Sequence, residues 1–201
     1  MAYDDFTIAG LEQRFGVATR ETSDLFRGAA EVDLPPILST TLDRYTPLAR
    51  DAGTGKARSE MVTAPMLAEL KFQHRHQLSF FSGVEFDVDP AAGLTGRCDF
   101  LLARSPRQLD VDAPACVAVV EAGDESIVAG IPRATARMIA ARRFNEAAGT
   151  PIDPIYGAVT TGLLWRFLRL EGNVAHVDAV EYPIQFARKI FGILTAMALG
   201  E

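Results

Sequence analysis

Apolar residues recur every three or four positions in five parts of this chain, and this spacing predicts amphipathic helices. Residues typical of helix ends flank several of them: Thr7 can cap the first helix, Gly16 follows it, and Pro35 and Pro36 begin the second. Pro65 falls inside the third and should kink it or mark a joint within it. The predicted helices cover residues 7–15, 36–48, 56–74, 131–147 and 183–199, with a shorter one around Leu25 and Phe26.

Shorter runs of alternating or continuous apolar residues lie between these helices and predict β-strands. Gly83 interrupts the first of them, and Thr161 and Gly162 turn the chain between two strands of a hairpin. The predicted strands cover residues 78–88, 96–103, 116–122, 155–159, 164–170 and 174–180. Because helices precede, interrupt and follow the strands, we expect an α/β protein with a mixed sheet and helices on both faces.

The composition is that of an ordinary globular protein, with 48% hydrophobic residues in a chain of 201. The net charge of −6 argues against a broad basic surface for nucleic acid but allows a local basic cleft. Cys98 and Cys116 lack CxxC spacing and a neighbouring His, which favours buried thiols in a reducing compartment over zinc or a disulfide. The N-terminal residues lack the apolar core of a signal peptide, and no apolar run is long enough to span a membrane. We therefore expect a cytoplasmic protein without a membrane partner.

Two acidic residues stand at unusual places in the central part of the chain. Asp99 lies within the apolar stretch GRCDFLLA, and Glu121 ends the apolar stretch ACVAVVE. A carboxylate in or beside an apolar strand is costly to bury unless a partner or a cation binds it. If these strands are neighbours, the two acids meet near one edge of the sheet, and Glu60, in the first turn of the 56–74 helix, can reach the same place. Three oxygen donors without His or Cys suit Mg²⁺ or Mn²⁺, which can activate water for phosphodiester hydrolysis.

A simpler explanation of the three acids stays open at this point. Glu60 also suits the positive end of the helix dipole, and Asp99 and Glu121 can pair with arginines. His74 and His76 are alternative metal ligands, but no third ligand has a suitable spacing. Solvent-exposed residues at the end of the 56–74 helix are the simpler interpretation of these two histidines.

The acids and their order resemble the PD-(D/E)XK, or restriction endonuclease-like, superfamily. This superfamily has the core order α-β-β-β-α-β, with a Glu in the first core helix, an Asp at the second strand and (D/E)xK at the third. Here KARSEMVTAPML supplies Glu60, GRCDFLL supplies Asp99 and VAVVEAG supplies Glu121. Segments such as FSGVEFDVDP, IYGAVTTG and WRFLRLEG are similar to those of stand-alone bacterial proteins, common in cyanobacteria, that look like the N-terminal nuclease domain of type I restriction enzyme R subunits.

The resemblance extends over nearly the whole chain and implies a restriction endonuclease-like α/β fold. It implies a helical N-terminal extension over residues 1–56 and a nuclease-like domain over 57–201, which ends in an additional hairpin and helix. It further implies that Glu60, Asp99 and Glu121 are the catalytic acids, that they bind Mg²⁺ or Mn²⁺, and that DNA is the substrate.

The chain departs from the family pattern at two positions. The family's lysine falls at position 123, which is glycine here, and a glutamine of the following helix falls at Arg133. The charge of that lysine would lie beside the attacking water and the scissile phosphate. Arg133 and Arg137, one helical turn apart, are candidates for a substitute cation, although arginine is a poor base because it stays protonated. The alternative interpretation is that Arg133 and Arg137 belong to a solvent-exposed basic face of the helix.

Three functions are compatible with this combination of motif and departure. The first is a Mg²⁺-dependent DNA endonuclease-like protein that is weakened or inactivated by Gly123. The second is a pseudo-nuclease, a non-enzymatic module on the same fold that binds DNA or protein, and a homodimer is one form of such binding. A third is an interaction protein whose helical lead-in recruits a partner.

Overall fold

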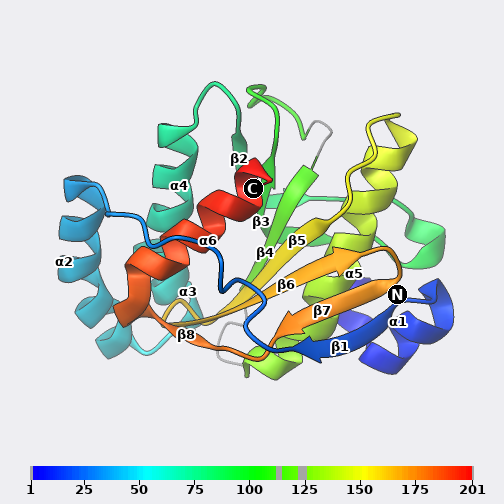
Figure 1. Cartoon of the computed structure of the whole chain (residues 1–201), viewed down its shortest axis with the longest axis horizontal. Helices are drawn as coiled ribbons and strands as arrows, with labels where there is room; N and C mark the ends of the chain where they lie inside the picture. The colour runs from blue at the N-terminus through cyan, green and yellow to red at the C-terminus, as the bar shows by residue number, and fades with distance from the viewer. Residues whose placement is uncertain (1, 112–114, 122–125, 201) are drawn as a thin grey trace.

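The described residues form an α/β structure around one mixed sheet (Figure 1). This computed structural model describes residues 2–111, 115–121 and 126–200, and for 115–121 it describes only the backbone. The strands are β1 (Ala18–Thr22), β2 (Ser79–Glu85), β3 (Arg97–Ala103), β4 (Ala115–Glu121), β5 (Ile155–Thr160), β6 (Leu164–Glu171), β7 (Val174–Asp178) and β8 (Tyr182–Pro183).

Neighbouring strands follow the order β1-β7-β6-β5-β4-β3-β2, and β8 pairs with β6. The pairs β1–β7 and β4–β5 are parallel, and the remaining pairs are antiparallel. A parallel pair needs a crossover connection, and α5 (Ile127–Ala147) lies in the connection between β4 and β5. A Cβ on Gly130 would lie 2.4 Å from Val159 Cγ1, so this glycine allows α5 to pack closely on β5.

Helices cover both faces of the sheet, as the sequence predicts. On one face, residues of α1 (Ile8–Phe15) and α5 join the first apolar cluster. On the other, residues of α2 (Pro36–Ala52), α4 (Ala64–Gln73) and α6 (Ala187–Leu199) join the second. Figure 1 shows α6 in front of the sheet and α5 behind it. Strand β3 is buried on both sides, because Leu101 packs in the first cluster and Phe100 and Leu102 pack in the second.

The predicted 56–74 helix exists, and Pro65 does mark a joint within it. The chain runs through α3 (Gly55–Arg58), a π-helical turn η2 (Ser59–Thr63) and α4 without leaving the helical region. The backbone N–H of Ala64 donates to the carbonyl of Ser59, five residues back. Proline lacks an N–H and crowds the preceding turn, so the wider turn just before Pro65 relieves this conflict. Glu60 lies within the widened turn.

Most predicted elements are confirmed near their expected bounds. Thr7 caps α1 through its hydroxyl, which accepts a hydrogen bond from Gly10 N, and Gly16 ends the helix with a φ of +67°. The interruption at Gly83 is a residue with a φ of +64° inside β2. The largest differences are at four boundaries: α2 continues to Ala52 rather than 48, α5 begins at Ile127 rather than 131, β2 ends at Glu85 rather than 88, and the last helix begins at Ala187 after the short 3-10 turn η4 (Ile184–Phe186). Other 3-10 turns are η1 (Tyr3–Asp5) and η3 (Pro90–Ala92).

The N-terminal segment differs more from expectation, since it contains a strand as well as helices. β1 is the polar sequence ATRET, which shows no apolar alternation, and it pairs with β7 at one end of the sheet. The helix predicted around Leu25 and Phe26 is wrong, because these residues lie in turns. Tertiary contacts hold those turns: Asp178 Oδ1 accepts from Leu25 N, and Lys189 Nζ donates to three carbonyls, those of Phe26, Arg27 and Ala29.

The close contact between this turn region and α6 gives a stability prediction. A Cβ on Gly192 would lie 1.9 Å from the carbonyl oxygen of Ala30. We expect Gly192→Ala to destabilise the protein by about 2 kcal/mol, because overpacking outweighs the gain in helix propensity of about 1 kcal/mol. Chemical denaturation measures the free energy of unfolding. Gly28→Ala, in the same region with nothing within 4 Å of a Cβ, is the matched control. Equal effects of the two substitutions would contradict the tight packing at Gly192.

Candidate active site

Glu60 and Asp99, two of the three acids singled out in the sequence, line the same pocket. The pocket has a volume of about 440 Å³ and lies where the α3–η2 segment faces the β2–β3 hairpin. Its walls therefore come from a helical segment on one side and from two antiparallel strands on the other. Its lining residues are Gly55, Lys56, Ser59, Glu60, Ser82, Gly83, Arg97, Asp99 and Phe100.

The helical side of the pocket is held against the end of the sheet by Arg58. Its Nε donates to the carbonyl of Thr161, in the turn between β5 and β6, over 2.8 Å. In the same turn, a Cβ on Gly162 would lie 2.7 Å from Arg58 Cβ and 3.1 Å from the Arg58 carbonyl oxygen. Gly162 also has a φ of +83°, which disfavours other residues. These contacts fix the segment that carries Lys56 and Glu60 next to the sheet.

Asp99 lies where the regular alternation of β3 is broken. Cys98 packs in the apolar cluster on the α5 side, and Phe100 packs in the cluster on the opposite face. The neighbouring strand contributes Gly83, which falls between the paired positions Ser82–Phe100 and Val84–Cys98 and so lies opposite Asp99. The positive φ of Gly83 and the broken alternation of β3 thus occur at the same level of the hairpin, and Asp99 is half-buried there.

Glu121 is the last residue of β4, and the backbone places it at the same end of the β3–β4 pair as Asp99. Phe100 pairs with Val119, so Asp99 and Glu121 lie one and two residues beyond that pair. On its other side, Glu121 pairs with Thr160 of β5. The side chain of Glu121 lies outside the described part of the structure, as does Gly123 altogether, so their predicted roles stay predictions.

Two cations also line the pocket, and neither was among the candidates from the sequence. Lys56 Nζ lies 2.6 Å from Glu60 Oε1, and the side chain of Lys56 is 81% exposed. The guanidinium of Arg97 lies across β2 at Gly83, because a Cβ on that glycine would be 2.3 Å from Arg97 Nη2. The four-residue spacing of Lys56 and Glu60 in a predicted helix was a usable signal for the first of them.

The arginines of α5 behave differently from the substitute cation considered above. Arg137 is only 4% exposed, lies 5.0 Å from the centre of the Tyr3 ring, and donates from Nη2 to the carbonyl of Arg97 over 2.7 Å. The expectation that it swings over the acids is therefore wrong, because burial against the N-terminal turn holds it elsewhere. Arg133, one turn earlier, is half-buried and is not among the described residues of the pocket lining, so its role stays a prediction.

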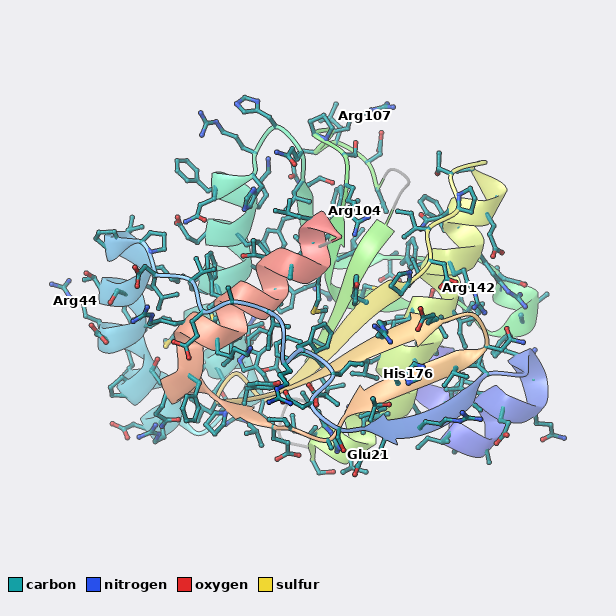
Figure 2. All side chains as sticks on the ribbon, in the orientation of Figure 1. Glu21, Arg44, Arg104, Arg107, Arg142 and His176 are labelled. Atoms are coloured by element: carbon teal, nitrogen blue, oxygen red, sulfur yellow. The ribbon has the colours of Figure 1, made fainter. Side chains whose placement is uncertain are left out.

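Several other arginines have structural partners away from the pocket. Arg143 pairs with Asp89 over 2.5 Å, Arg142 donates to the carbonyl of Gly172, and Arg104 donates to carbonyls at the end of α6. Figure 2 shows Arg104 and Arg107 well away from Arg142, so these three do not form one continuous basic track.

The donor set of the pocket fits a hard divalent cation. Mg²⁺ in phosphoryl-transfer sites commonly binds one or two carboxylates and keeps water or substrate phosphate as its other ligands. Glu60 and Asp99 supply two carboxylates in an open pocket. Among the side chains that the structure describes, no group of three or more His, Cys, Asp or Glu converges, so a third carboxylate would have to come from Glu121.

Comparison of the chain with protein-family models, with curated proteins and with solved structures finds no match. Within the described ranges, no helix combines the length and the apolar character needed to cross a membrane.

The strand that carries Asp99 also contains a buried thiol with a testable pH dependence. Burial raises the pKa of Cys98 to about 11 from its ordinary 9.0, and the nearby Arg137 guanidinium only partly opposes this. The folded state therefore favours the neutral thiol. Its contribution to stability is complete below pH 9 and is lost as the pH rises through 11.

We expect this ionisation to remove roughly 2 kcal/mol from the free energy of unfolding between pH 8.5 and 11. Urea unfolding of the native protein and of Cys98→Ala at several pH values measures it. The other titrating groups, including Tyr3, whose pKa burial also raises, are present in both proteins. The Cys98→Ala protein should lose less stability over this range, and equal losses would contradict the assignment to the thiol.

Proposed function

We propose that this protein is a Mg²⁺- or Mn²⁺-dependent phosphodiesterase that cleaves DNA, on a restriction endonuclease-like fold. What supports the fold is the order α4-β2-β3-β4-α5-β5, with three antiparallel strands followed by a helical crossover to a parallel strand. This order is the α-β-β-β-α-β core that the sequence resemblance implies.

One observation carries the functional proposal. Glu60 and Asp99, which come from a helix and a strand far apart in sequence, line one open pocket, and β4 ends with Glu121 at the same end of the adjacent strand pair. Carboxylates on a surface usually spread apart because like charges repel. Two carboxylates that line one pocket together with two cations suit a site that binds a divalent metal and a phosphate.

In this proposal Asp99 and Glu60 hold the metal, and Glu121 completes the set. The metal, when bound, polarises the phosphate and provides an activated water. The chain's own residues contribute position and charge: the π-helical turn presents Glu60, and the break in β3 presents Asp99. Arg97 lies over Gly83 at the pocket, where its guanidinium can bind a phosphate of the substrate backbone.

Plasmid nicking with Mg²⁺ or Mn²⁺ tests this function. We expect the native protein to nick DNA, EDTA to stop the reaction, and Asp99→Asn to lower the rate by at least about 10²-fold, the scale of losing one group that stabilises the transition state. Asp51→Asn, the same change on the exposed end of α2, is the control and should leave the rate unchanged. Metal-independent nicking, or an Asp99→Asn protein as active as the native one, would overturn the proposal.

A parallel assay with Gly123→Lys, which adds the lysine typical of the family, separates a nuclease from a pseudo-nuclease. Cleavage by this variant but not by the native protein would identify a disabled nuclease whose acids remain. DNA binding without cleavage by either protein would favour the non-enzymatic module.

A further inference from the structure

We infer that Lys56 is the cation of the active site and contacts the scissile phosphate in place of the lysine absent at position 123. The inference rests on the proposed phosphodiesterase function, because it assigns a role within the same pocket. It replaces the arginines of α5 that the sequence suggested.

The position of Lys56 is the first argument. It lines the pocket together with both described acids, and it lies in the first turn of α3, which Thr54 caps through a hydroxyl that accepts from Ala57 N. Four residues later in the same helical segment comes Glu60, so the ammonium group and a metal-binding carboxylate share one face. The Arg58 contacts with the β5–β6 turn hold this face against the sheet.

The availability of its charge is the second argument. Lys56 pairs with Glu60 over 2.6 Å, but both side chains are well exposed, at 81% and 60%. An exposed pair four residues apart in a helix contributes little to stability, because water screens it and ordering two long side chains opposes it. The ion pair between Lys56 and Glu60 is therefore easily replaced by contacts of either side chain with a ligand. With the Glu60 carboxylate engaged by a bound metal, the ammonium group of Lys56 would lie at the pocket and would be able to bind a phosphate oxygen.

The other cation of the pocket suits a different task. The guanidinium of Arg97 lies over Gly83, and a planar guanidinium fits two oxygens of one phosphate. An ammonium group is a compact point charge on a flexible stem, which suits a single oxygen whose negative charge grows during the reaction. Hydrolysis forms a bond from a water oxygen to phosphorus and breaks the bond from phosphorus to one ester oxygen. The water gives a proton to solvent, the leaving oxygen takes one from solvent, and Lys56 transfers none.

Matched lysine substitutions test the inference. We expect Lys56→Met to lower kcat for plasmid nicking by about 10²- to 10³-fold, the effect typical of losing one group that stabilises the transition state. Lys56→Arg keeps the charge and should stay within about tenfold of the native rate. Lys71→Met, in the last turn of α4, removes the same charge from a half-buried lysine outside the pocket and should cleave like the native protein. The thermal unfolding temperature should be the same for all three.

A binding measurement provides a readout that does not depend on cleavage. Fluorescence anisotropy with a labelled DNA duplex in Ca²⁺, which binds carboxylate oxygens and so competes with Lys56 for Glu60, gives the number of phosphate contacts when it is repeated at several salt concentrations. Loss of one contact lowers the slope of log K against log salt by about 0.9. We expect this decrease for Lys56→Met and a smaller one or none for Lys71→Met.

The outcomes separate the two proposals. Metal-dependent nicking by the native protein, with Lys56→Met equally active and its salt slope unchanged, would overturn the role of Lys56 and leave the nuclease function standing. Equal losses in Lys56→Met and Lys56→Arg would also overturn it, since the charge would then not matter. If the native protein does not nick DNA, the nuclease function fails. A reduced salt slope in Lys56→Met would then still support its phosphate contact, and an unchanged slope would overturn it.

Discussion

The candidate site depends on one contact between a helix and the end of the sheet. Arg58 Nε donates to the carbonyl of Thr161, and Gly162 leaves room for the Arg58 backbone to approach. Lys56 and Glu60 lie within two residues of Arg58 on either side, so this contact helps to hold their side chains beside Asp99 at the pocket. Val62, buried in the second apolar cluster, holds the same segment from its other end.

The strand side of the site is constrained by the packing of β3. A strand buried on both faces leaves little freedom for a polar residue, because each face must fill an apolar cluster. β3 accommodates Asp99 where its alternation breaks, opposite a glycine of β2 with positive φ. The break directs the carboxylate into a pocket rather than into either cluster. An irregular position in an otherwise regular sheet is thus the feature that makes an acid available at this place.

Much of the architecture could be predicted from local patterns. The 3.6-residue spacing of apolar residues located the long helices, and short apolar runs located the central strands, because each pattern reflects which face an element buries. The strand β1 could not be found in this way, since ATRET is half-exposed and its identity as a strand comes from pairing with β7. The turns around Phe26 could not be predicted from the local sequence either, because Lys189, more than 150 residues later, binds their carbonyls.

The sequence by itself determined the order of the elements from α2 onward and the joint at Pro65, and it singled out Glu60 and Asp99 as candidate site residues. Apolar periodicity, proline geometry and the cost of placing an acid in an apolar strand are all local properties. Only the tertiary structure decided which cations join the acids. Lys56 and Arg97 enter the pocket, while Arg137 is buried against Tyr3 on the other side of β3. The spacing of Lys56 and Glu60 was a local signal, but the position of Arg97 depends on the close contact at Gly83 and on the pairing of β2 with β3, which leave none.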